Sequence, residues 1–133
     1  MEVDRSRNNK VKCAVLDTNV LMYIFLYKVD VFSQLKEYGV NEFIVPLQVF
    51  NELKSLEKSK GNEKRAARFA LNLIKHCKIV EVDAVGADNA LIKTAKKYGC
   101  YLITNDKALR KKARKNKIVV GYIRKLKKLE IEE

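Results

Sequence analysis

Residues 12–22, KCAVLDTNVLM, decide how the rest of this sequence is interpreted. The apolar run at residues 14–16 is typical of a short strand that is buried on both faces of a sheet. A helical pattern begins directly after Asp17, Thr18 and Asn19. Because ligands bind outside the carboxyl ends of strands in open parallel sheets, Asp17 is well placed for chemistry. The alternative is that Asp17 or Asn19 only caps the helix, which is the more common role for a single aspartate.

Short apolar segments alternate with helical patterns along the rest of the chain. Further strands are expected near residues 42–46, 78–82, 100–104 and 118–122. Helices are expected between residues 20 and 38 in two parts, and at 47–58, 62–76, 85–98 and 107–114. This alternation predicts an α/β fold in which helices cover both faces of a mostly parallel sheet. We expect a tail at residues 1–11 and one domain at residues 12–133.

The composition is that of an ordinary globular protein, with 47% hydrophobic and 33% charged residues. No apolar run approaches the roughly 20 residues that span a bilayer, and the charged N-terminus lacks a signal-type apolar core. We therefore expect a cytoplasmic protein with no membrane partner. The three cysteines lie in or beside apolar runs without paired spacing, which favours reduced thiols in the core over a disulfide or zinc site: Cys13, Cys77 and Cys100.

The chain carries a strong excess of positive charge, with 28 Lys and Arg against 16 Asp and Glu and a formal net charge of +12. Residues 107–128 contain eleven basic residues and no acidic residue. A solvated protein surface normally mixes the two signs, so a run of one sign favours contact with a polyanion such as nucleic acid over mere solubility.

Two further aspartates occupy unusual positions. Asp88 precedes Leu91 and Ile92 by three and four residues, which predicts that it projects from the sheet-facing side of its helix. The alternative is an acid in the first helical turn, where the helix dipole favours it. Residues 104–106, TND, follow an apolar strand just as residues 17–19, DTN, follow the first one. Two strands thus end in similar chemistry.

If these two strands are parallel neighbours, Asp17 and Asp106 emerge at one edge of the sheet. The helices that carry Glu52 and Asp88 begin from the same edge, so four carboxylates converge. At 4 Å each pair of like charges repels by about 4 kcal/mol at an effective dielectric near 20, which calls for a compensating cation. Oxygen ligands without histidine or cysteine select Mg²⁺ or Mn²⁺ over zinc.

The order of four motifs, LDTN, an ELxxL helix, ADxxLIxxA and LITND, resembles the PIN-domain ribonuclease family over about residues 12–122. The resemblance implies a three-layer α/β/α sandwich with a sheet of about five mostly parallel strands. It also implies Mg²⁺- or Mn²⁺-dependent endonucleolytic hydrolysis of RNA phosphodiester bonds. The catalytic and metal-binding acids that it implies are Asp17, Glu52, Asp88 and Asp106, and the supporting polar residues are Asn19 and Thr104.

The basic segment at residues 107–128 has more positive charge than this fold requires, which suggests a broad RNA-binding surface. Candidate phosphate contacts are Lys107, Arg110, Lys111, Arg114 and Lys115. Within the family, residues 52–74 and 122–133 look closer to the archaeal ribosomal-RNA-processing branch than to VapC-type toxins. A VapC-type toxin and a noncatalytic RNA-binding assembly factor remain as alternatives. A homodimer, an antitoxin and a pre-ribosomal partner all stay open.

A phosphatase of the haloacid-dehalogenase type would also place an acid at the end of a strand. It requires a second aspartate two residues after the first, and this sequence has Asn19 there. That departure argues against the phosphatase.

Overall fold

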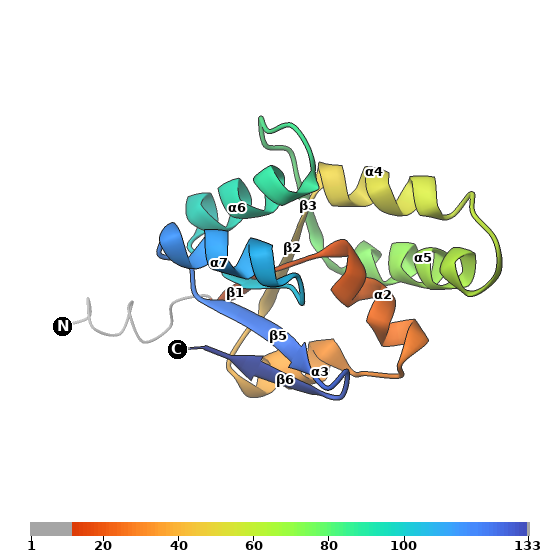
Figure 1. Cartoon of the computed structure of the whole chain (residues 1–133), viewed down its shortest axis with the longest axis horizontal. Coiled ribbons are helices and arrows are strands. Elements are labelled where there is room, and N and C mark those ends of the chain that lie inside the picture. The colour runs from red at the N-terminus through yellow and green to blue at the C-terminus, as the bar shows by residue number, and fades with distance from the viewer. Residues whose placement is uncertain (1–11, 133) are drawn as a thin grey trace.

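The computed structural model describes residues 12–132, so the expected tail at residues 1–11 lies outside the described residues. The strands are β1 (Cys13–Leu16), β2 (Glu42–Pro46), β3 (Lys78–Val80), β4 (Tyr101–Ile103), β5 (Val120–Arg124) and β6 (Lys128–Ile131). The helices are α2 (Thr18–Leu26), α3 (Val31–Glu37), α4 (Leu47–Leu56), α5 (Gly61–Leu73), α6 (Ala87–Tyr98) and α7 (Lys107–Lys115), with a 3-10 turn at Ile74–His76. Figure 1 shows how these elements are arranged.

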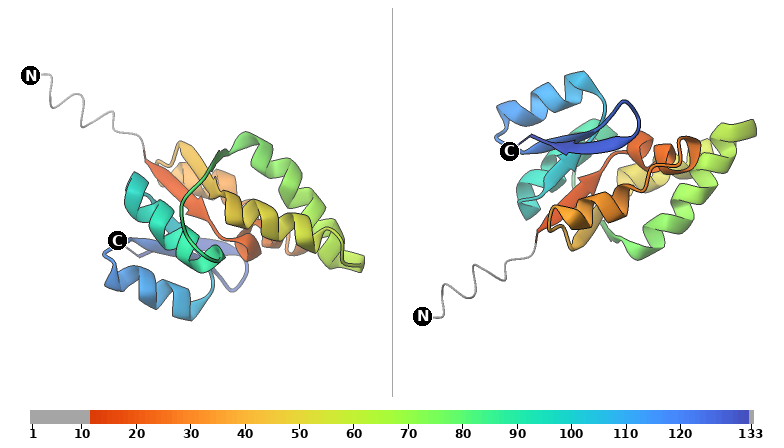
Figure 2. Two further views of the ribbon diagram at one scale, coloured as in Figure 1. Left: turned by 90° about the horizontal axis from the view of Figure 1, so that it is seen from above. Right: turned by 90° about the horizontal axis from the view of Figure 1, so that it is seen from below.

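The six strands form one sheet in the order β3-β2-β1-β4-β5-β6. The first five are parallel, and β6 runs antiparallel to β5. Figure 2 shows α7 on one side of the β5–β6 pair and α3 on the other. The predicted three-layer α/β/α sandwich with a mostly parallel sheet is confirmed.

Strand β6 is the one strand of the described chain that the sequence did not predict. It lies at the edge of the sheet, where lysines are common because they discourage pairing with other chains. Its sequence, KLEI, has no unbroken apolar run of the kind that marked the buried strands. The last parallel strand was also placed two residues too early, since β5 covers Val120–Arg124 and not residues 118–122.

Strand β1 lies at the centre of the sheet because its side chains can be buried on both faces. Ala14, Val15 and Leu16 are completely buried. Val15 pairs with Ile44 of β2 on one side and with Leu102 of β4 on the other. The apolar run of residues 14–16 therefore forms the doubly covered strand that was expected.

The parallel register brings the ends of three strands into line. Leu16 pairs with Ile103 of β4, and Ile103 pairs with Gly121 of β5. A Cβ atom on Gly121 would lie 2.7 Å from Cδ1 of Ile131 and 3.0 Å from the backbone oxygen of Glu130, so any larger residue would have to displace its neighbours. The residues that follow Leu16 and Ile103, namely Asp17 and Thr104, emerge side by side at the carboxyl edge of the sheet.

The expectation of three reduced thiols is wrong for two of them. Cys13 and Cys100 form a disulfide, with Cα atoms 4.8 Å apart. Each lies one residue before the paired positions Ala14 and Tyr101, so the register of β1 and β4 brings the two thiols opposite each other. Cys77 is the free cysteine of the described chain. The partners are 87 residues apart in sequence, and no local spacing pattern marks such a pair.

No helix within residues 12–132 is both long and apolar enough to cross a membrane.

Candidate active site

Asp17 ends β1 and occupies the N-cap position of α2, but its side chain makes no capping hydrogen bond to that helix. Instead, Thr104 Oγ1 donates a hydrogen bond of 2.6 Å to Asp17 Oδ2. Asp17 is only 8% exposed, and Thr104 is completely buried. A carboxylate with that burial and a partner from another strand is not simply a helix cap.

Burial raises the pKa of Asp17 from an ordinary value of 3.8 to about 6. The hydrogen bond from Thr104 and one from the Thr18 backbone amide oppose this shift, because both favour the charged form. The negative charges of Asp88 and Glu52 add to it. Asp17 is therefore a desolvated acid surrounded by other acids, which a nearby cation would stabilise in its charged form.

Thr104 connects the ends of β1 and β4. Its hydroxyl donates to Asp17 and accepts a hydrogen bond of 3.1 Å from the backbone N–H of Asp106. Its carbonyl accepts a hydrogen bond of 3.1 Å from Nη1 of Arg110. Both the hydroxyl and the backbone of Thr104 are thus fixed, which holds the carboxylate of Asp17 in one orientation. The predicted supporting position of Thr104 has a clear physical basis.

Glu52 lies on the exposed side of α4 and accepts a short hydrogen bond from the hydroxyl of Thr18. Thr18 is only 3% exposed and belongs to the first turn of α2. Sequence reasoning gave the supporting position in this segment to Asn19, whose side chain is exposed. The available signal was a hydroxyl residue directly after Asp17, on the side of the helix that faces α4.

Asp88 lies in the first turn of α6, where the chain turns at Gly86 with φ 87°. The expectation that Asp88 belongs to the sheet-facing side is wrong: its side chain is exposed, whereas Leu91 and Ile92 are buried. Because Asp88 lies in the first turn of α6, it is located at the carboxyl edge of the sheet. Partial burial raises the pKa of Asp88, and the charges of Asp106 and Glu52 add to that rise, whereas Lys112 opposes it.

The loop before α6 is tied to α4. Nε2 of Gln48 donates to the carbonyl oxygens of Val82 and Ala84, at 3.0 and 2.9 Å. The side chain of Asn89 then bonds the carbonyl of Val85 at 3.0 Å. These contacts fix the start of α6, and with it Asp88, relative to the helix that carries Glu52.

Asp106 has the capping role that Asp17 lacks. It is the N-cap of α7, and its Oδ1 accepts a hydrogen bond of 3.0 Å from the backbone N–H of Leu109. The neighbouring Asn105 bridges to β5, since its side chain exchanges two hydrogen bonds with the backbone of Ile123. The turn after β4 is therefore rigid, and the exposed carboxylate of Asp106 is held at the edge of the sheet.

The causes of the pKa shifts of Asp17 and Asp88 indicate that the four predicted acids lie near one another. The charges of Asp88 and Glu52 act on Asp17, and those of Asp106 and Glu52 act on Asp88. However, no three acidic, histidine or cysteine side chains within residues 12–132 lie close enough together to hold a metal ion. The tight four-carboxylate cluster that the sequence suggested does not form in this arrangement. Asp17, Glu52 and Asp106 each accept a hydrogen bond from a different partner, which are Thr104, Thr18 and Leu109. Repulsion between the like charges also keeps the carboxylates apart.

The donor set nevertheless fits a hard divalent cation. It consists of carboxylate oxygens, with threonine hydroxyls beside them and neither histidine nor cysteine. The raised pKa of Asp17 reflects burial and neighbouring negative charge, both of which a cation would offset. Asp17 and Asp106 are linked through Thr104, whose hydroxyl donates to the carboxylate of Asp17 and accepts from the backbone N–H of Asp106.

Two of the five candidate RNA-binding residues are engaged within the protein. Arg114 forms a two-pronged ion pair with Glu132, at 2.9 and 3.0 Å. The guanidinium of Arg110 stacks on the ring of Tyr122, 4.5 Å from its centroid, while it holds the carbonyl of Thr104. The other three lie exposed on α7 at intervals of four residues: Lys107, Lys111 and Lys115. Neither Tyr122 nor the internal role of Arg110 was foreseen, because the two residues are on different elements.

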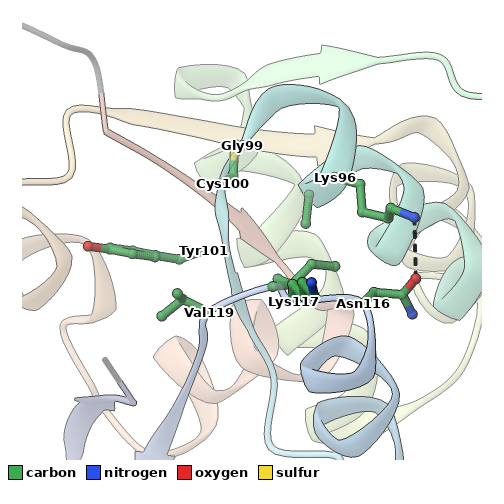
Figure 3. A pocket seen from close by; sticks show the side chains of 9 residues that line it. Lys96, Gly99, Cys100, Tyr101, Asn116, Lys117 and Val119 are labelled. Atoms are coloured by element: carbon green, nitrogen blue, oxygen red, sulfur yellow. Dashed lines mark hydrogen bonds between the residues drawn. The ribbon is translucent and has the colours of Figure 1, made fainter. Parts of the chain in front are cut away.

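The hollow shown in Figure 3 lies at the opposite edge of the sheet, where β4 and β5 begin. It has a volume of about 310 Å³ and is lined in part by Lys96, Cys100 and Asn116. Lys96 Nζ donates a hydrogen bond of 3.3 Å to Asn116 Oδ1 across it. It contains none of the four acids and is separate from the candidate active site.

A model of the PIN like domain family matches residues 14–126, which span all four acids. The chain is 53% identical to Ribonuclease VapC9 of Archaeoglobus fulgidus, over 99% of this chain and 98% of that protein. It is 38% identical to Ribonuclease VapC4 of Methanocaldococcus jannaschii, over 88% of this chain and 94% of that protein.

Among solved structures, the PIN domain endonuclease Utp24 has a TM-score of 0.74 at 23% identity, with 90% of each chain covered. VapBC2 of Rickettsia felis, in complex with a promoter DNA fragment, has a TM-score of 0.61 at 14% identity, covering 83% of this chain and 98% of that one. These two likenesses show the fold alone. Together with the family match and the two similar ribonucleases, they establish that this chain belongs to the PIN-domain ribonuclease family and is VapC-like.

Proposed function

We propose that this protein is a divalent-metal-dependent endoribonuclease whose active site is the carboxyl edge of β1 and β4. The observation that carries the proposal is the buried carboxylate of Asp17, fixed by Thr104 and influenced by the negative charges of Asp88 and Glu52. A structural aspartate in a core is normally neutralised by a basic partner. Asp17 has instead a pKa raised to about 6 by burial and by the charges of other acids.

The proposed ligands of Mg²⁺ or Mn²⁺ are Asp17 and Asp106, with Glu52 and Asp88 binding directly or through water. A bound divalent ion would supply charge neutralisation on the phosphate and activation of a water molecule. The residues of the chain have the task of orientation: Thr104 fixes Asp17, and Thr18 fixes Glu52. No side chain is required as a nucleophile, so the four acids and their hydroxyl partners form the whole proposed machinery.

The proposed RNA surface is the exposed side of α7. Lys107, Lys111 and Lys115 follow one another at single helical turns, and α7 starts at Asp106. Phosphate contacts along this row would place the RNA backbone beside the acids. Arg110 and Arg114 are better explained as structural residues, because their guanidinium groups already bind Thr104 and Glu132.

The two curated relatives carry the name VapC, which favours the toxin of a toxin–antitoxin pair as the biological setting. An antitoxin partner is then expected. The ribosomal-RNA-processing setting has the likeness of residues 52–74 and 122–133 in its favour. Both settings use the same edge of acids and the same hydrolysis of RNA.

The proposal is tested by incubating the purified protein with single-stranded and structured RNA, in Mn²⁺, in Mg²⁺ and in EDTA. We expect endonucleolytic products with metal and none in EDTA. Asp17→Asn should reduce the cleavage rate by roughly 100-fold or more while RNA binding changes by no more than a few-fold. Asn has nearly the same size and can still accept the hydrogen bond from Thr104, so the fold should be retained.

Equal cleavage rates for the Asp17→Asn variant and the natural sequence would remove the activity from this site. RNA binding without cleavage in any metal, by a well-folded protein, would instead favour the noncatalytic assembly factor. Lys75→Gln provides a control for a substitution far from the site, because Lys75 is exposed and lies just before the start of β3, at the opposite edge of the sheet.

A further inference from the structure

The turn between β5 and β6 is strongly basic and emerges at the edge of the sheet that carries the acids. Residues 124–128, RKLKK, contain four basic residues in five. Arg124 is the last residue of β5, three positions beyond Gly121, which lies in the same row as Leu16 and Ile103. At about 3.3 Å per residue, the turn extends roughly 10 Å beyond that row. Figure 1 shows the β5–β6 turn at the same edge of the sheet as the start of α2.

The backbone of this turn is unfavourable for its own residues. Lys125 has φ 53° and Leu126 has φ 56°, so both residues adopt the left-handed conformation. The pairing of Arg124 with Lys128 leaves a three-residue loop, and hairpin positions with positive φ normally carry Gly, Asn or Asp, because a side chain with a Cβ is disfavoured there. Residues held in sparsely populated conformations cluster at functional sites, which makes this turn a candidate for one.

Contacts from α3 hold the turn in place. Nε2 of Gln34 donates to the carbonyl of Lys127 at 3.2 Å, and Oε1 of the same side chain accepts from the N–H of Leu129 at 2.7 Å. The hydroxyl of Tyr38 reaches the carbonyl of Leu129 at 3.5 Å. The basic side chains are therefore presented from a fixed backbone and not from a loose loop.

The charges on the turn have little internal compensation. Arg124 lies 4.0 Å from Glu130, at the limit of an ion pair. Within residues 12–132, no carboxylate lies within ion-pairing distance of Lys125, Lys127 or Lys128, and all three are exposed. Repulsion among neighbouring like charges opposes this arrangement, so a polyanionic ligand would stabilise it.

We propose that residues 124–128 form a second RNA-binding element, the basic turn, which contacts phosphates of a single-stranded substrate at the carboxyl edge of the sheet, beside the start of α7. This inference rests on the proposed ribonuclease function and adds to it the path of the RNA. Helix α7 begins at Asp106 at the carboxyl edge, and the basic turn leaves the same edge at the end of β5, so an RNA strand bound to both elements runs along the edge that carries the acids. Long flexible lysines suit phosphate contacts.

An RNA ligand is favoured over a protein partner by the composition of the basic turn. Stable protein interfaces have a buried apolar centre with aromatic or arginine anchors. In the basic turn, Leu126 is the one apolar residue and is only partly exposed. Four charges of one sign around it match a phosphate backbone better than the mixed surface of a folded protein.

The test compares two double variants, each of which has lost two positive charges. Lys125→Gln with Lys127→Gln removes two positive charges from the basic turn. Lys75→Gln with Lys97→Gln removes two exposed charges from the opposite edge of the sheet, before β3 and before β4. Binding of a fluorescent oligouridine of about 12 nucleotides is measured by anisotropy in EDTA, across a salt titration, so that no cleavage is required. Thermal melts verify that both variants are folded.

We expect the variant of the basic turn to bind several-fold more weakly at moderate salt. Its slope of log affinity against log salt should be shallower by about 1.4, because each phosphate contact to single-stranded RNA contributes about 0.7. The control should change affinity by less than about twofold. Equal losses in both variants, or no loss in either, overturn the basic turn as a binding element. If the natural protein itself does not bind RNA, the proposed function fails, which is a distinct result.

Discussion

The ends of β1 and β4 look alike in sequence and behave differently in the structure. Each apolar strand is followed by an aspartate, a threonine and an asparagine, in the orders DTN and TND. Asp17 follows its strand directly, is buried, and makes no capping bond to α2. Asp106 follows its strand two residues later, is exposed, and caps α7 through the N–H of Leu109.

The difference shows that the position of the acid after the strand decides its role. The residue directly after a central strand is still covered by neighbouring strands, and in β4 that position is taken by Thr104. The hydroxyl of Thr104 then serves both ends, since it donates to Asp17 and accepts from the N–H of Asp106. One strand end supplies the acid, and the other supplies the group that orients it.

The largest expected effect concerns the pH dependence of stability without metal. The pKa of Asp17 is about 6 in the folded protein, above its ordinary value of 3.8. The contribution of Asp17 to the free energy of unfolding is therefore fully present below pH 3.8. It is lost as the pH rises through about 6. This loss amounts to about 3 kcal/mol. Asp17→Asn should remove that part of the pH dependence, as measured by urea unfolding in EDTA between pH 4 and pH 7.5.

A saturating divalent cation should reverse the same loss in the natural sequence, because a ligand that binds only the folded state stabilises it. An Asp17→Asn variant with an unchanged pH profile would contradict the difference between the two strand ends.

The next prediction concerns the hydroxyl of Thr104, which connects the ends of β1 and β4. Thr104→Val keeps the shape of a buried side chain but removes the hydroxyl that serves Asp17 and the Asp106 amide. The loss of stability should be about 1–3 kcal/mol, because buried polar groups are left without partners. RNA cleavage should also fall, since Asp17 loses its orientation. Denaturant unfolding at pH 7.5 and cleavage assays in Mn²⁺ measure the two effects.

Thr104→Ser is the matched control, because it keeps the hydroxyl and removes only a methyl group. It should retain more cleavage activity than the valine variant. If serine and valine reduce activity equally, the hydroxyl does not couple the two strand ends.

The smallest effect separates the two roles of Asp106. Asp106→Ala removes the cap of α7 and should cost about 1 kcal/mol, whereas Asp106→Asn retains a good capping residue and should cost much less. Both variants should reduce the rise in melting temperature produced by Mn²⁺, because both lose a proposed ligand. Thermal melts in EDTA and across a metal titration distinguish the cap from the ligand. Equal stability of the two variants in EDTA would show that the cap contributes nothing.

Features that depend on local pattern could be predicted before the fold was known. Apolar runs and helical periodicity predicted the five parallel strands and the helices that cover them, because burial imposes those periods directly. The position of Asp17 after a central strand also followed from the chain alone, as did the basic character of residues 107–128, whereas the role of the four acids as a site stays a prediction.

The contacts between distant side chains became known only from the folded chain. Asp17 and Thr104 are 87 residues apart, and so are Cys13 and Cys100, because both contacts depend on the pairing of β1 with β4. The same holds for Arg110, whose guanidinium stacks on Tyr122 and donates to the carbonyl of Thr104. Strand register and side-chain direction arise from packing across the whole sheet, and no local spacing in the sequence records them.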